Sequence, residues 1–104
     1  MNEQQFQDQV DALFLQIEQW LEQADTVLDF ETAQGILTIT LPQASQLILS
    51  RQPSLQEVWL ATPVGAYHFS YRQKWLTKKG EELISLLQEI IQQKANIILD
   101  PNTF

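Results

Sequence analysis

The sequence predicts an α+β fold, a two-layer sandwich in which two terminal helices pack on one face of an antiparallel sheet of five to six strands. Three observations predict it. Apolar residues recur with a helical period near both ends of the chain. Between them, apolar and polar residues alternate with a period of two, and short turns divide that stretch. Helices that flank a meander of strands cover one face of the sheet and leave the other face in water.

The first helix is expected at about residues 3–23. Its apolar residues follow one another at intervals of three and four, which places them on one face of the helix. Trp20 lies at the edge of this apolar arc and should be a core or boundary residue. The members of the arc are Phe6, Val10, Leu13, Phe14, Ile17, Leu21 and Ala24.

The middle of the chain predicts the strands. In the first of them, Leu28 and Phe30 alternate with Asp29 and Glu31, which is the period of a half-buried strand. Gly35 is available for a turn with positive φ after this strand. The strands are expected at 27–32, 36–41, 46–50, 57–61 and 66–72, with a short sixth at 74–77.

The last helix is expected at 81–94. Two glutamates stand at its positive N-terminal end and Lys94 at its negative C-terminal end, as the helix dipole prefers. The apolar tail at 97–99 is expected to pack against the helices. The buried stripe of this helix is Leu83, Leu86, Leu87, Ile90 and Ile91.

Length and composition fit one domain over residues 1–104. A chain of 104 residues with 44% apolar residues can bury one core. The absence of cysteine excludes disulfides, thiolate metal sites and a thiol nucleophile. The N-terminus lacks the features of a signal peptide, and no apolar run approaches the roughly 18 residues of a membrane span. We therefore expect a cytoplasmic protein.

Negative charge is concentrated in the first half of the chain. Residues 1–50 carry eight acidic residues and no Lys or Arg, whereas residues 51–104 carry five acidic and six basic residues. With a net charge of −7, nucleic acids and anionic membranes are excluded as partners, because binding them requires Lys and Arg.

Five carboxylates are expected to share one exposed surface, which we call the acidic ridge: Glu18, Glu22, Asp25, Asp29 and Glu31. Asp8 and Asp11 extend it along the same helix face, within an arc of about 100°. Glu18 and Glu22 repel one another at i,i+4, and no basic residue on this helix relieves them.

Three interpretations of the acidic ridge stay open on spacing alone. It is a solvated helix face, a set of weak open sites for hard cations such as Fe²⁺, Fe³⁺, Mn²⁺ or Ca²⁺, or a dock for a basic partner. EF-hand spacing and a His–carboxylate triad are both missing from the sequence.

Trp59 should face water, because Val58 and Leu60 on either side of it should face the core. An exposed tryptophan is typical of an interface anchor, unless its ring lies flat on the neighbouring strands. His68 should also point outward, as an ordinary strand residue or as an ancillary metal ligand. No motif of nucleophilic, nucleotide or zinc-protease chemistry occurs, so we do not expect an enzyme.

Several segments resemble frataxins, and in particular the bacterial CyaY type. Residues 50–61, Ser-Arg-Gln-Pro-Ser-Leu-Gln-Glu-Val-Trp-Leu-Ala, are similar to the frataxin signature of a strand ending in Asn-Arg/Lys-Gln, a proline turn and Gln-hydrophobic-Trp-hydrophobic-Ala/Ser. Residues 65–69, Gly-Ala-Tyr-His-Phe, resemble the Gly-x-Tyr-His-Phe of that type, and residues 35–40 resemble its Gly-Val-Leu-Thr-Ile strand. The chain departs from the signature at Ser50, Pro53 and Glu57.

The resemblance implies an iron-binding protein of iron–sulfur cluster assembly, an iron donor or a regulator of the cysteine desulfurase. Its partners would be the desulfurase and the scaffold protein, and it would be a monomer that oligomerises with iron. The acidic ridge would hold Fe²⁺ or Fe³⁺ weakly. Trp59, with Arg51 and Gln52 nearby, would form a partner surface, and Glu18 and Glu22 would also contact the partner. The alternatives are an acidic binding module or chaperone without a metal, and a ferroxidase.

Overall fold

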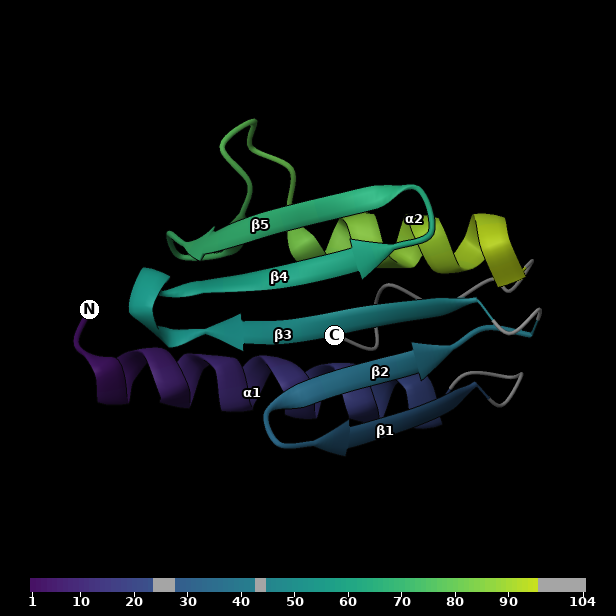
Figure 1. Ribbon diagram of the computed structural model, residues 1–104, viewed down its shortest axis with the longest axis horizontal. Helices are drawn as coiled ribbons and strands as arrows, with labels where there is room; N and C mark the ends of the chain where they lie inside the picture. Colours follow the sequence, from purple (N-terminus) through teal and green to yellow (C-terminus); the bar gives the residue numbers. More distant parts are fainter. Residues whose placement is uncertain (24–27, 43–44, 96–104) are drawn as a thin grey trace.

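The structure, a computed structural model, describes residues 1–23, 28–42 and 45–95. It has two layers, with two helices on one face of a six-stranded antiparallel sheet, as Figure 1 shows. The strands follow one another in chain order from β1 to β6, so the sheet is a meander. The predicted fold class is confirmed. Neither of the described helices is long and apolar enough to cross a membrane.

Helix α1 (Glu3–Glu22) begins where the pattern predicts because a capping box fixes its start. The side-chain oxygen of Asn2 accepts a hydrogen bond from the Gln5 N–H at 2.7 Å, and the side-chain oxygen of Gln5 accepts one from the Asn2 N–H at 2.9 Å. Both bonds satisfy backbone donors that the first turn of a helix leaves unpaired.

Helix α2 (Leu83–Ala95) begins two residues later than the predicted range of 81–94. Glu82 stands before the helix and caps it, because its carboxylate accepts hydrogen bonds from the Ile84 N–H and the Ser85 hydroxyl, both at 2.9 Å. Thr77 holds Glu81 outside the helix by accepting the Glu81 N–H at 3.1 Å. A capping glutamate has no signature in hydrophobic period, so the sequence pattern places the start too early.

Each strand lies within two residues of its predicted range. The strands are β1 (Asp29–Ala33), β2 (Ile36–Thr40), β3 (Gln46–Gln52), β4 (Glu57–Thr62), β5 (Gly65–Tyr71) and β6 (Trp75–Leu76). Gln34 and Gly35 connect β1 to β2 with φ of +53° and +78°, the two-residue turn that matches the twist of a hairpin. A 3-10 turn at Pro53–Leu55 separates β3 from β4, where the proline predicts a break.

The core lies between the helices and the inner face of the sheet. The apolar stripe of α1 is buried, and Trp20 and Trp75 join it with 2% and 5% of their surface exposed. On the sheet, inward side chains alternate with outward ones, as the buried Val58 and Leu60 on either side of Trp59 show. The predicted tail at 97–99 lies outside the described residues.

We expect truncation of a core side chain of β3 to destabilise the protein strongly. Leu49 is fully buried, so Leu49→Ala should lower the free energy of unfolding by about 2–5 kcal/mol. Leu15, which is 54% exposed on α1, provides the matched control, and Leu15→Ala should cost less than about 1 kcal/mol. Urea unfolding measures both, and equal losses would contradict the assigned core.

Candidate functional site

The carboxylates of α1 lie outside its buried stripe, and those of Asp11 and Glu18 lie on the side of the helix next to the sheet. Asp8, Asp11 and Glu22 are exposed, and Glu18 is half-buried. Their exposure follows from the burial of the apolar stripe, because the remaining surface of an amphipathic helix then faces water. Glu18 and Glu22 thus lie outside the buried stripe of α1, as the helical period predicts, and their role as metal ligands stays a prediction. Asp25 lies outside the described residues.

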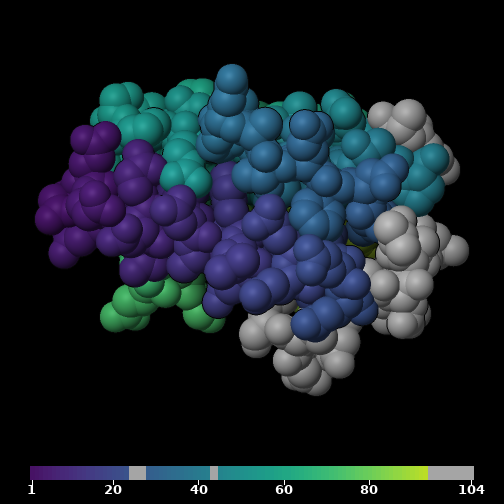
Figure 2. All heavy atoms as spheres, turned by 90° about the horizontal axis from the view of Figure 1, so that it is seen from below, coloured from purple at the N-terminus to yellow at the C-terminus, as the bar shows by residue number. Residues whose placement is uncertain are grey.

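Strand β1 lies beside α1 at the edge of the sheet. The Thr32 hydroxyl donates a hydrogen bond of 2.6 Å to the Glu18 carboxylate, which ties the two elements together. Figure 2 shows this side of the molecule, with α1 in purple to indigo alongside the blue atoms of β1 and β2. The strand and the helix therefore form one continuous edge.

The other two ridge carboxylates point to the outer face of β1. Asp29 and Glu31 are exposed, whereas Phe30 between them packs against the core. They pair across the hairpin with Thr40 and Thr38, which face the same way. The acidic ridge thus wraps around the edge strand, with Glu18 and Glu22 on its helix side and Asp29 and Glu31 on its outer side.

The carboxylates are spread out rather than gathered at one point. Within residues 1–23, 28–42 and 45–95, no three acidic or histidine side chains come close enough to hold one metal ion. A cation at this surface would therefore take one or two carboxylates and complete its shell with water. Such sites are open and exchange their ions readily.

Arg51 does not lie on the Trp59 surface, contrary to the sequence-based expectation. It pairs with Val58 on the inner side of the sheet and reaches α1. There its guanidinium donates to the Gln7 side-chain oxygen at 2.6 Å, forms an ion pair with Asp11 at 3.0 Å and lies 5.2 Å from the Phe14 ring centroid. Strand alternation explains this placement, since Arg51 and its neighbours Ser50 and Gln52 must face opposite ways.

This placement also changes the electrostatics at one end of the acidic surface. The ion pair with Arg51 neutralises Asp11, which is itself 65% exposed. Glu18, Glu22, Asp29 and Glu31 form no ion pair within the described residues. The cation-attracting part of the surface is therefore its far end, where α1 meets β1.

Trp59 faces outward, as predicted, but its ring is half-buried by a neighbouring side chain. It stacks on His68, its cross-strand partner on β5, with ring centroids 4.1 Å apart and an angle of 10° between the planes. Its indole N–H donates to Glu57 at 2.8 Å. The alternation of each strand places both rings outward, but only the register between β4 and β5 places them opposite one another.

The other predicted partner residue, Gln52, lies on the same outer face as Trp59. Its side-chain amide donates to the Ser50 hydroxyl at 3.3 Å, and Ser50 is the cross-strand partner of Trp59. Gln52, Ser50, Trp59 and His68 therefore form one polar and aromatic patch, which we call the outer patch. It lies on the opposite face of the sheet from α1.

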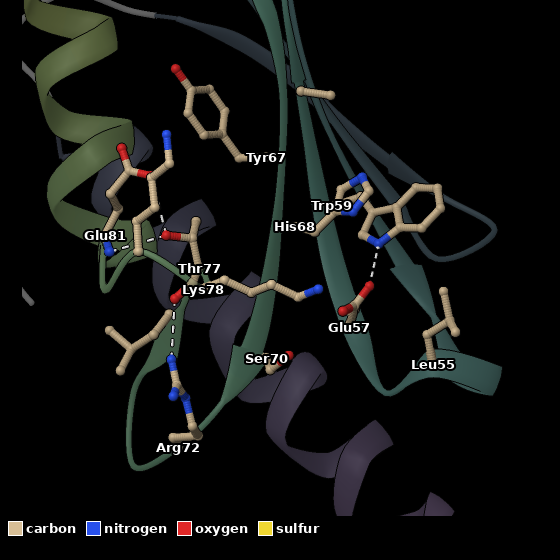
Figure 3. A pocket seen from close by; sticks show the side chains of 13 residues that line it. Leu55, Glu57, Trp59, Tyr67, His68, Ser70, Arg72, Thr77, Lys78 and Glu81 are labelled. Carbon is tan, nitrogen blue, oxygen red and sulfur yellow. Dashed lines mark hydrogen bonds between the residues drawn. The ribbon is translucent and has the colours of Figure 1, made fainter.

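A groove of about 880 Å³ borders the outer patch on the side of β5. It lies between the strands β4 and β5 and the loop that leads from β6 into α2 (Figure 3). Lys78 and Lys79 line it from the loop, and Trp59 and His68 line it from the sheet. Nothing in the hydrophobic pattern predicts this groove, although the pair of lysines next to Gly80 is visible in the sequence.

The fold and these surfaces define a small, acidic α+β sandwich with an open sheet face. A family model described as the frataxin-like domain matches residues 1–97. The iron–sulfur cluster assembly protein CyaY of Pseudomonas entomophila is 38% identical to this chain, in an alignment that covers 96% of this chain and 94% of that relative. The chain belongs to the frataxin family, of the CyaY type, as its motifs predict.

Solved structures carry the same fold. The frataxin of Psychromonas ingrahamii has a TM-score of 0.91 at 29% identity, over 96% of this chain and 97% of that one. The trimeric frataxin of Saccharomyces cerevisiae, complexed with ferrous iron, has a TM-score of 0.69 at 24% identity, over 92% of this chain and 88% of that one.

The position of Arg51 predicts a difference between two glycine substitutions. Gly35 and Gly80 both have positive φ, +78° and +88°, so alanine at either position should cost about 1 kcal/mol of folding free energy. A Cβ at Gly35 would also lie 3.3 Å from the Arg51 side chain, which three contacts hold in place, whereas a Cβ at Gly80 meets nothing within 4 Å.

Gly35→Ala should therefore lower the stability more than Gly80→Ala does. Chemical unfolding of the two variants checks this, and Gly35→Ala combined with Arg51→Ala shows whether the excess comes from the contact. Equal losses of stability in the two single variants would mean that the Arg51 side chain can move away from the new Cβ without a measurable loss of folding free energy.

Proposed function

We propose that this chain takes part in iron–sulfur cluster assembly, where it binds iron weakly on the acidic ridge and acts as an iron donor or as a regulator of the cysteine desulfurase. The observation that carries the proposal is the segregation of charge. Four described carboxylates without an ion pair line the edge where α1 meets β1. The name of the CyaY relative supports the pathway.

The chemistry of the acidic ridge suits a donor better than a storage site. Carboxylate oxygens are hard ligands that accept Fe²⁺ and Fe³⁺, and Glu18 and Glu22 lie one helical turn apart on α1. Binding one cation between them removes their mutual repulsion. Because no third protein ligand converges on this pair within the described residues, water completes the shell and the ion leaves easily.

The same surface also suits a basic partner. Negative potential along α1 and β1 steers Lys- and Arg-rich surfaces toward it, and a desulfurase contact there would compete with bound iron. Iron would then tune the contact with the partner. The outer patch, with Trp59 at its centre, is the proposed contact for the scaffold protein.

Two alternatives make different predictions. An acidic binding module or chaperone without a metal role would use the same charge but would bind no iron. A ferroxidase would consume oxygen with Fe²⁺ faster than a protein-free control does. The described residues offer no cluster of three metal ligands for such a reaction. We propose a non-enzymatic role, in a cytoplasmic protein that is monomeric until iron promotes its oligomerisation.

Iron binding can be tested with a matched pair of variants. Titration with Fe²⁺ under anaerobic conditions, or with Co²⁺, should shift or broaden the amide NMR signals of residues 18–22 and 29–31. Glu22→Gln should weaken the effect several-fold, because each removed carboxylate is one of the few ligands available. Glu89→Gln on α2, also exposed, is the control and should change nothing. Perturbations spread evenly over the surface would contradict the site.

Desulfurase binding has its own test. Pull-down with the cysteine desulfurase of the same organism should succeed at low salt and fail near 0.5 M salt, since exposed charges are screened there. The reversal Glu18→Lys with Glu22→Lys should abolish binding, and Glu89→Lys should preserve it. Binding that survives both high salt and the double reversal would exclude the acidic ridge as the dock, whatever the iron titration shows.

A further inference from the structure

Strand β5 is paired along nearly the whole of one edge and only at one end of the other. Residues 65–70 pair with β4, whereas β6 pairs only with Ser70 and Tyr71. In the part of the chain that the structure describes, residues 65–69 therefore have no strand on their outer edge. Figure 1 shows β5 as the last long strand on its side of the sheet.

The direction of the free backbone groups follows from the alternation of an antiparallel ladder. The Arg72 N–H donates to the Lys74 carbonyl at 2.8 Å, on the side of β6. Backbone groups of every second residue point the same way, so those of Ser70, His68 and Ala66 also point to that side. Ser70 meets Leu76 of β6, and the N–H and C=O groups of Ala66 and His68 are left facing the open edge.

The groove described above runs along this open edge. Ala66, Tyr67 and His68 line it from β5, and Lys78 and Lys79 line it from the loop before α2. Its volume of about 880 Å³ falls in the range of roughly 300–1,000 Å³ typical of ligand sites. Free backbone donors and acceptors beside an open groove are what an added β-strand requires.

The groove carries a small net positive charge, opposite in sign to the acidic ridge, because Arg72, Lys78 and Lys79 line it against Glu57 and Glu81. Four of the six basic residues of the chain lie at 72–79, in a protein whose net charge is −7. Among the described residues, Lys78 and Lys79 make no ion pair, and no hydrogen bond of either side chain is found. Figure 3 shows Lys78 extending across β5 toward Glu57. The mouth of the groove thus offers an incoming segment two lysines that form no ion pair within the described residues.

The side chains on β5 define the rest of the specificity. His68 is exposed on the outer face, and Tyr67 packs against the core on the inner face. An added strand would present alternate side chains to these two faces. Acidic side chains suit the face near Lys78, and apolar side chains suit the face near Tyr67.

We propose that the β5 edge is a docking site for an extended acidic peptide segment of a partner protein, which adds a seventh strand to the sheet through the backbone of Ala66 and His68. Main-chain hydrogen bonds supply the attachment, and Lys78 and Lys79 select for negative charge. The site is separate from the acidic ridge, so it would operate whether or not iron is bound there.

A seven-residue peptide of alternating glutamate and valine, capped at both ends, is the probe. Added to the full chain, it should shift the amide NMR signals of residues 65–69 and slow the exchange of the Ala66 and His68 amide hydrogens. Lys78→Glu with Lys79→Glu should weaken binding about tenfold, because two favourable charge contacts become repulsive. Lys74→Glu, which removes the same kind of charge outside the groove, is the control and should change affinity less than about twofold.

Two further peptides separate strand addition from simple charge attraction. N-methylation of alternate peptide amides should abolish binding if backbone hydrogen bonds carry it, and replacement of glutamate by lysine should abolish it if charge selects the ligand. Each of three results would overturn the proposal: no binding at millimolar peptide, binding that N-methylation leaves intact, or protection of residues 66 and 68 that rises with protein concentration alone. The last would mean that a second copy of the chain occupies the edge.

Discussion

The packing of α1 on the sheet is the contact on which the other features depend. Phe6, Val10 and Ile17 are fully buried along one stripe of the helix. Burial of several such side chains contributes about 1.5–3 kcal/mol each, far more than any surface charge on the same helix can oppose. Once this stripe is buried, the carboxylates of α1 must face water, and the opposite face of the sheet must stay open.

The cost of this arrangement is electrostatic. Glu18 and Glu22 repel one another, and Asp29 and Glu31 follow around the edge strand. Within the described residues, one ion pair offsets this accumulation of negative charge, the one between Arg51 of β3 and Asp11 of α1. The relieved end of α1 is therefore tied into the structure, and the unrelieved end stays available to cations or to a basic partner. Stability and proposed function thus occupy different parts of one helix.

The two faces of the sheet differ in their side chains because the helices cover only one of them. The inner face contributes Leu47, Leu49 and Phe69 to the core, all fully buried. The outer face carries the Trp59–His68 stack and, beyond β5, the open edge beside Lys78. Acidic and basic surfaces lie apart on the molecule, so a partner could contact one without covering the other. This separation allows the two proposed contacts, at the acidic ridge and at the β5 edge, to be tested independently.

The sequence alone determined the order and type of the elements, because periods of 3.6 and 2 are local properties that burial then enforces. It also placed Trp59 outward and Glu18 and Glu22 on one exposed helix face, since each follows from the position of its apolar neighbours. The sequence did not predict the start of α2, because the side-chain cap at Glu82 does not change the spacing of the apolar residues.

Only the tertiary structure decided which residues from different elements meet. Arg51 contacts α1 rather than Trp59 because successive residues of a strand face opposite sides of the sheet. Arg51 belongs to β3 only because β3 pairs with β4 beyond residue 50. The stack of Trp59 on His68 depends on the register between β4 and β5, and the hydrogen bond from Thr32 to Glu18 depends on the packing of the sheet edge on α1. Register and packing are non-local: they are fixed by contacts between residues far apart in the chain, which no pattern within one segment contains.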